Sequence, residues 1–267
     1  MGILYSRCIG ALSAKGKYIF PLDNDDMFLD EDVFQTITNI AEKGFFDIVE
    51  FKGIESKKGE NDDVLKNKIG DAKFANRPLN LVLYQPVLGN YQIWPTNIMN
   101  KYHVEVVYLW GKCIRIEIYQ KAINKLGKER FSKYMLRYED ILMIYAIFNT
   151  ARSYKFVGKY GVFNIYRETS ASRIKYITET NLCQIYYIDV VIDFVQDTIE
   201  NKMILVNLIL NLFRKNSLER TLKKSKDIYN LFISSIDKVL KMTKISDRLK
   251  SEIRKKGKQL KFIDYPF

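Results

Sequence analysis

The sequence predicts an α/β fold followed by an all-helical C-terminal region, and three neighbouring segments carry the first part of this prediction. Residues 3–15 place small and apolar side chains at helical spacing and end at a Lys-Gly pair, a common helix C-terminus. The apolar run KYIFPL (17–22) is too short for a helix and predicts a buried strand. Residues 31–44 carry an apolar stripe at helical spacing that ends at Gly44, with Asp30 as a suitable N-cap. This alternation of helices and strands is typical of α/β proteins.

The alternation continues toward the middle of the chain. The segment FDIVEFKGIES (46–56) predicts the next strand. Residues 54–75 are polar and charged, so we expect an exposed excursion there. Residues 76–105 bring prolines and aromatic residues close together and predict an irregular, partly apolar loop.

The second half of the chain returns to regular patterns before it becomes helical throughout. Residues 106–123 predict a strand that turns into a helix, and residues 138–151 are strongly helical. Residues 153–168 predict one or two strands. From about residue 176 onward only helical patterns occur, so we expect a first domain at 1–173 and a helical, basic region at 174–267.

Composition excludes several classes of protein. With 267 residues and 47% hydrophobic content, the chain can bury a substantial core in one large or two small domains. The three cysteines (Cys8, Cys113 and Cys183) are far apart and lack CxxC spacing, which argues against a disulfide framework or zinc site and favours a reducing compartment such as the cytoplasm. His103 is the only histidine, so hydrolases with a histidine base and most zinc enzymes are excluded.

Most of the excess positive charge lies in the last fifth of the chain. Residues 214–267 contain 16 basic and 6 acidic residues, whereas residues 1–213 contain 27 and 25. Such a tail can contact an anionic lipid or nucleic-acid surface, but a solvated helix face is the commoner case. It contains no recognised nucleic-acid-binding motif, so we expect no nucleic-acid partner. The most apolar segment, 203–213, is too short to span a membrane and predicts a buried helix.

A crowded acidic turn follows the first predicted strand. Asp23, Asp25 and Asp26 lie within four positions, and like charges this close repel unless water, an arginine or a metal ion neutralises them. One interpretation is a solvated turn. The other is a site for Mg²⁺ or Mn²⁺, which carboxylates at i and i+2 can hold together with substrate phosphates. Ligands of open α/β sheets bind at this edge, where strands end.

Three further groups of residues are candidates for chemistry, and each also has a structural explanation. The pair Glu139–Asp140 opens a helix, where it would favour the helix dipole or supply a general base. Trp110 and Lys112 offer an aromatic face and a cation, although a tryptophan at a strand–helix corner is usually a core residue. Arg167 suits a phosphate group, but surface arginines are common.

The order of these motifs resembles that of inverting family 2 glycosyltransferases with the GT-A fold. Members of that family typically show Arg-Asn, Gly and Ala-x-Gly before a strand that ends in Leu-Asp-x-Asp-Asp. The matching residues here are Arg7, Gly10, Ala14, Gly16 and Leu22 to Asp26. Further matches are FDIVEF (46–51), the Trp-x-Lys-x-x-Arg segment at 110–115, YEDILMIYAIF (138–148) and the Tyr-Arg…Ser segment near Arg167. The resemblance covers about residues 4–173 and implies a Rossmann-like mixed sheet with flanking helices.

The resemblance also implies a role for each matched residue. Asp23 and Asp25 would hold Mn²⁺ or Mg²⁺ on the diphosphate of a nucleotide sugar, most simply a UDP-sugar. Asp140 would be the general base that deprotonates the acceptor hydroxyl of a glycan, lipid or protein, with inversion at the sugar, and Glu139 would orient the base or acceptor. The remaining donor- and acceptor-binding residues would be Arg7, Asp23, Trp110, Lys112 and Arg167.

Two departures from the family pattern qualify these roles. Cys8 stands where the family prefers Asn. The family also has an upstream βαβ unit that holds the nucleotide base, and we expect this chain, as an N-terminally truncated form, to lack that unit and leave an open sheet edge. The alternative to an active glycosyltransferase is therefore an inactive, degenerate carbohydrate-binding remnant. For either, we expect a cytoplasmic protein, with peripheral membrane contact through the basic tail left open.

Overall fold

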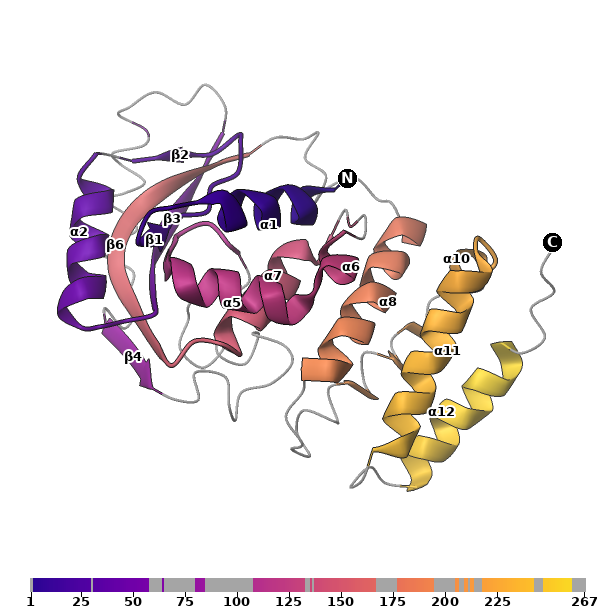
Figure 1. The fold of residues 1–267 in the computed structure, drawn as a ribbon. Helices are drawn as coiled ribbons and strands as arrows, with labels where there is room; N and C mark the ends of the chain where they lie inside the picture. Colours follow the sequence, from indigo (N-terminus) through magenta and orange to yellow (C-terminus); the bar gives the residue numbers. More distant parts are fainter. Residues whose placement is uncertain are drawn as a thin grey trace.

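The structure is a computed structural model. It describes residues 2–29, 31–57, 64, 80–84, 108–132, 135, 137–166, 177–194, 205–206, 209–210, 212–213, 218–242 and 247–260. Within these ranges the fold is mixed α/β, which confirms the predicted class. Figure 1 shows a curled sheet with helices packed beside it, followed by the helices of the C-terminal region.

The sheet has six strands and mixes parallel with antiparallel pairing. Its order is β1-β5-β3-β6-β2, with β4 also paired to β6. Only the β3–β6 pair is parallel among the described strands, and the others are antiparallel. The strands are β1 (Tyr18–Ile19), β2 (Met27–Phe28), β3 (Ile48–Lys57), β4 (Asn80–Tyr84), β5 (Lys112–Arg115) and β6 (Ser153–Tyr166).

Helices bury the sheet from both sides. In β3, Ile48 belongs to one hydrophobic cluster and Val49 to another, because successive side chains of a strand point to opposite faces. The first cluster includes residues of α1, α5, α7 and the C-terminal helices, and the second lies under α2. The helices are α1 (Ile3–Ser13), α2 (Asp32–Lys43), α5 (Ile116–Leu126), α6 (Lys128–Phe131), α7 (Glu139–Phe148), α8 (Ile177–Phe194), α10 (Leu218–Leu222), α11 (Lys226–Lys241) and α12 (Asp247–Leu260).

The C-terminal helices extend the first of these clusters. Tyr187 and Ile188 of α8 and Phe232 of α11 are buried in the same cluster as Met143 of α7. Most described residues of the apolar segment 203–213 are buried there too, and Phe213 packs against the cluster partly buried, which fits the predicted buried helix. The cluster thus continues past residue 173, and the division of the chain into two domains at that position stays a prediction.

Most predicted elements are present, and the main differences concern the strands. The first strand is shorter than expected, since β1 has only two residues. Residues 54–57, expected to begin an exposed excursion, instead continue β3 in register with β6, and nearly all of the remaining predicted excursion lies outside the described residues. Within the region expected to be an irregular loop, Asn80–Tyr84 form β4, which pairs with the start of β6. Short edge strands such as β2 and β4 depend on the β6 partner, which local sequence patterns do not show.

Gly111 provides a direct test of this packing. Its φ is +71°, and a Cβ built there would lie 2.8 Å from the Phe51 carbonyl oxygen, while the Gly111 carbonyl accepts the Phe51 N–H at 2.8 Å. We therefore expect Gly111→Ala to lower the free energy of unfolding by roughly 2 kcal/mol or more, measured by urea denaturation. Gly10 is the control, because it lies in α1 with nothing within 4 Å of its Cβ position. Gly10→Ala should raise stability by roughly 0.5–1 kcal/mol, and equal effects at both sites would contradict this account.

Candidate active site

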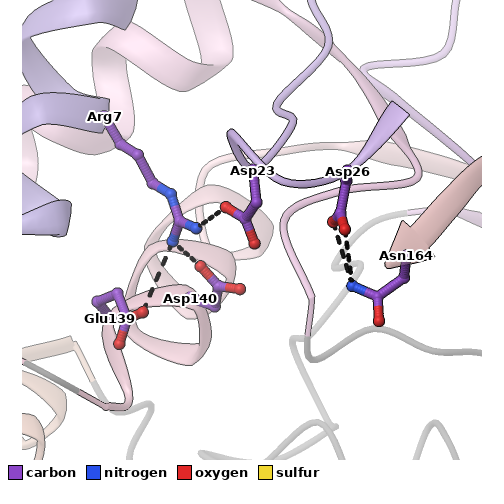
Figure 2. A network of polar contacts seen from close by, with 6 residues as sticks. All are labelled: Arg7, Asp23, Asp26, Glu139, Asp140 and Asn164. Carbon is purple, nitrogen blue, oxygen red and sulfur yellow. Dashed lines mark hydrogen bonds and ion pairs between the residues drawn. The ribbon is translucent and has the colours of Figure 1, made fainter. Parts of the chain in front are cut away.

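Arg7 joins three carboxylates that come from two distant parts of the sequence. Its Nη2 donates to Oδ1 of Asp23 in the acidic turn, and its Nη1 donates to Oδ1 of Asp140 at the start of α7 (Figure 2). The same Nη1 lies 3.9 Å from Oε1 of Glu139. The guanidinium fork allows one cation to serve several carboxylates at once.

Packing of α1 against α7 places these side chains. Cys8, the neighbour of Arg7, is buried with its Sγ 3.8 Å from Sδ of Met143 in α7. Tyr138 takes a left-handed conformation, with φ of +69°, just before α7 begins. Glu139 and Asp140 thus occupy the first turn of the helix, where the positive end of the helix dipole favours negative charge.

A second set of contacts anchors the acidic turn to the sheet. The Asp26 carboxylate accepts the Asn164 side-chain amide at 3.1 and 3.2 Å (Figure 2). It also accepts the Ile165 N–H at 2.9 Å, so both donors come from β6. The Asp26 N–H donates to the Asp23 carbonyl at 3.1 Å and closes the turn. Asp26 therefore faces β6, whereas Asp23 faces Arg7, so the neighbouring acids have different roles.

Burial shifts two carboxyl groups of this region in the same direction. Desolvation raises the pKa of Glu139, and the nearby Asp23 raises it further, while Arg7 opposes the shift. Desolvation also raises the pKa of Asp26, against the hydrogen bonds from Ile165 and Asn164. Arg7 thus offsets only part of the cost of holding Glu139 ionised in this partly buried position.

The acidic turn has the donor atoms that a hard divalent cation prefers, but it does not form a complete protein site. Asp23 and Asp25 supply carboxylate oxygens suited to Mg²⁺ or Mn²⁺. In the part of the chain that the structure describes, no group of three or more His, Cys, Asp or Glu is arranged to hold a metal ion. A cation at the turn would therefore need further ligands from substrate phosphates or water, as is usual for Mg²⁺.

The other residues selected from the sequence lie in different settings. Trp110 is 9% exposed, packs against Gly53 and stacks on Tyr108, with ring centroids 4.8 Å apart. Lys112 is only 1% exposed and lies 3.2 Å from Oε2 of Glu50. Arg167 lies outside the described residues. The structure thus gathers Arg7, Asp23, Glu139 and Asp140 in one place, whereas Lys112 is sealed inside the sheet.

Two residues with clear contacts were missed by the sequence-based selection. Asn164 anchors the acidic turn, but nothing in its local sequence distinguishes it from other polar residues at a strand end. Glu50 pairs with Lys112, and here a signal exists, since a carboxylate interrupts the apolar run of FDIVEF. A charge in the middle of a buried strand indicates a buried partner.

Comparison with known proteins gives a likeness in fold. No protein-family model matches the chain, and no curated protein matches it in sequence. Among solved structures, the crystal structure of S. aureus TarS, residues 1–349, is similar with a TM-score of 0.52 and 10% identity. The match covers 97% of this chain and 68% of that chain, and TarS is a family 2 glycosyltransferase. At this identity the likeness shows a glycosyltransferase-like fold and nothing finer.

The charge balance at Arg7 predicts a pH-dependent defect. Arg7→Met removes the cation, so the pKa of Glu139, already above its ordinary value of 4.5, should rise further. A carboxyl whose folded-state pKa is raised costs stability above its unfolded pKa, and the cost disappears as the pH falls toward that value. We expect Arg7→Met to lose roughly 2 kcal/mol of unfolding free energy at pH 7 and clearly less at pH 5.

The control for this variant is a surface ion pair. Lys17 lies 2.8 Å from Glu42, and both side chains are at least half exposed. Lys17→Met should leave the unfolding free energy nearly unchanged at both pH values, because solvent screens such pairs. Urea denaturation at the two pH values measures the effect. A defect of Arg7→Met that is the same at pH 5 and pH 7 would contradict the charge-balance explanation.

Proposed function

We propose that this protein is a metal-dependent, inverting glycosyltransferase of the GT-A type that transfers a sugar from a nucleotide-sugar donor to an acceptor hydroxyl. The observation that carries the proposal is the meeting of Asp23 and Asp140 on Arg7, because it unites the acidic turn with the carboxylate at the start of α7. The glycosyltransferase-like fold supports it. The two motifs are separated by more than a hundred residues in the sequence, so their meeting is a property of the fold.

In the proposed reaction the side chains divide the work. Asp140 accepts the proton of the acceptor hydroxyl, whose oxygen forms the new bond to the anomeric carbon from the face opposite the leaving group. The bond from that carbon to the nucleoside diphosphate breaks, and the diphosphate leaves with the bonding electrons. Mn²⁺ or Mg²⁺, when held by Asp23 and Asp25 on the diphosphate, would offset the charge that develops there. Arg7 supplies a further cation that suits a diphosphate.

Several finer assignments complete the proposal. Glu139 lies beside Asp140, the proposed base, and its carboxylate is 3.9 Å from the same Arg7 nitrogen. It would orient the base or the acceptor. Arg167 would contact phosphate, and Trp110 would line the acceptor side. The donor class that we propose is a UDP-sugar, and the acceptor is a glycan, lipid or protein. Lys112, which the resemblance places on the same side, is buried beside Glu50, and we propose a positioning role for it below.

The proposal is tested by turnover of UDP-sugars with Mn²⁺ and p-nitrophenyl glycosides as acceptors. Asp140→Asn keeps the size of the side chain but removes the base, so the rate should fall by about 10²–10⁴-fold. Asp25→Asn removes a proposed Mn²⁺ ligand, so Mn²⁺ should bind more weakly and stimulate turnover less, and the rate should fall as well. Asp237→Asn is the matched control, because Asp237 is exposed on α11, far along the chain from the motif residues.

Each outcome of this assay distinguishes the two candidate functions. Turnover that is lost in Asp140→Asn but kept in Asp237→Asn supports a glycosyltransferase. Binding of a sugar without turnover, unchanged in Asp25→Asn and Asp140→Asn, would instead support a carbohydrate-binding remnant. If the protein binds neither donor nor acceptor, with or without Mn²⁺, the proposed function is wrong.

We also propose that the basic C-terminal helix contacts the anionic, cytoplasmic face of a membrane. No helix in the described ranges is long and apolar enough to cross a membrane. The helix α12 packs on the rest of the protein through the buried Ile253 and carries Arg248, Arg254 and Lys255 exposed to solvent. Exposed cations near an anionic lipid surface each contribute on the order of 1 kcal/mol, and salt screens the attraction.

Vesicle sedimentation tests the membrane contact. Reversal of two charges, Arg254→Glu with Lys255→Glu, should lower the partition onto vesicles that contain phosphatidylserine by at least about tenfold at low salt. Reversal of Lys121 and Lys125, which are also exposed but lie on α5, is the control. Equal losses for both pairs would indicate a response to net charge alone, which would contradict a contact through α12.

A further inference from the structure

An ion pair is sealed between the central strands of the sheet. Glu50 of β3 and Lys112 of β5 are register partners, and Nζ of Lys112 lies 3.2 Å from Oε2 of Glu50. Their side chains are 2% and 1% exposed. From β6, the Tyr154 hydroxyl donates to the same Oε2 at 3.1 Å. Burial and the Glu50 charge raise the pKa of Tyr154 well above its usual value, so this phenol remains a proton donor.

Stability alone is a weak explanation for such a pair. The cost of removing two charges from water usually cancels most of their attraction, and apolar side chains of similar volume would fill the same space. A buried ion pair is better explained by something that its fixed geometry holds in place. Here Lys112 makes a further contact, since its Nζ donates to the Tyr108 carbonyl oxygen at 2.5 Å.

That carbonyl belongs to a segment with two stacked aromatic rings. The Tyr108 and Trp110 rings are 4.8 Å apart and nearly parallel, at 13°. Trp110 lies directly over Gly53, where a Cβ would come within 2.3 Å of the indole. Trp110 is therefore packed against the sheet, while Tyr108, which stacks on it, is 43% exposed. The stacked pair forms a flat aromatic surface whose base is held by Lys112.

The same surface is linked to the acidic turn. Trp110 belongs to the hydrophobic cluster that Leu22 packs against, and Leu22 directly precedes Asp23. The aromatic pair and the acidic turn therefore rest on the same hydrophobic cluster. The Gly111 carbonyl, which accepts the Phe51 N–H at 2.8 Å, holds the segment to β3 at its other end.

We propose that Glu50 and Lys112 are positioning residues that fix the Tyr108–Trp110 pair as a rigid platform for the ring of the acceptor sugar. The identity of the ligand, an acceptor sugar, rests on the proposed function, whereas the positioning of the aromatic pair by Glu50 and Lys112 does not. The exposed aromatic face suits the apolar face of a sugar ring, because flat aromatic side chains provide apolar contact area at a small cost in side-chain entropy. Lys112 acts through the Tyr108 backbone and makes no contact with substrate in this assignment.

Four variants separate positioning from simple stabilisation. They are Lys112→Met, Glu50→Gln, the double variant with both changes, and Tyr154→Phe, all in a Trp94→Phe background so that Trp110 is the single tryptophan. Each of the first two leaves one buried group without its charged partner and should lower the thermal midpoint. The double variant removes both charges and should recover most of that loss.

The decisive readout is the fluorescence of Trp110. If Lys112 positions the platform, the double variant should show Trp110 quenching by acrylamide about two- to threefold stronger than the parent, despite its recovered stability. Tyr154→Phe keeps the contact from Lys112 to the Tyr108 carbonyl, so its quenching should match the parent. If acrylamide quenches Trp110 equally in the double variant and in the parent, the Glu50–Lys112 pair is only structural, and the proposal is overturned.

Kinetics with the p-nitrophenyl glycosides test the ligand. The double variant should raise the acceptor KM about tenfold while the UDP-sugar KM and kcat change little, because the platform contacts the acceptor alone. An acceptor KM equal to that of the parent, together with increased quenching, would overturn the acceptor role and keep the positioning. Absence of turnover in the parent as well would mark a failure of the proposed function, which the quenching result does not depend on.

Discussion

The candidate site depends on one arginine among three carboxylates. Asp23, Glu139 and Asp140 would repel one another strongly in a partly buried setting, where charges interact more than in water. Arg7 makes their approach possible, although its guanidinium carries a single charge against three carboxylates. The raised pKa of Glu139 comes mainly from its burial, and the nearby Asp23 adds to it. The arrangement is therefore complementary to additional positive charge. A divalent cation on a diphosphate, as proposed above, would bring both the missing charge and the anion that Arg7 can bind.

The same centre requires a rigid support, which β6 provides. This strand runs in parallel with β3 along nearly its whole length and pairs with β4 and β2 on its other side. Near its end, Asn164 and Ile165 hold Asp26, so the acidic turn is fastened to the longest strand of the sheet. Of the three aspartates in the turn, Asp26 is thereby committed to structure. The charge that faces Arg7 comes from Asp23.

Sequence patterns predicted the parts of this protein that depend on local periodicity. The amphipathic helix α2, the change from strand to helix after Arg115, and the acidic start of α7 all follow from spacing within one segment. The strands β2 and β4 were missed because they exist only through pairing with β6. That Asp23 and Asp140 belong to one site was predicted only through the family resemblance, because no local pattern shows which distant segments touch. Glu50 could have been found, because a buried strand rarely carries an unpaired charge.

Arg7 and Lys112 show why residue type alone does not define a role. Both are basic, both were selected as ligand-binding residues, and both make ion pairs with carboxylates. Arg7 is 17% exposed and shares its donors among three acids, so a competing anion can reach it and exchange with them. Lys112 is 1% exposed, with Glu50 on one side and the Tyr108 carbonyl on the other, so any exchange would leave a charge buried without a partner. The first arrangement suits binding and release of a charged ligand, and the second suits a fixed geometry. The difference lies in burial, which the sheet determines.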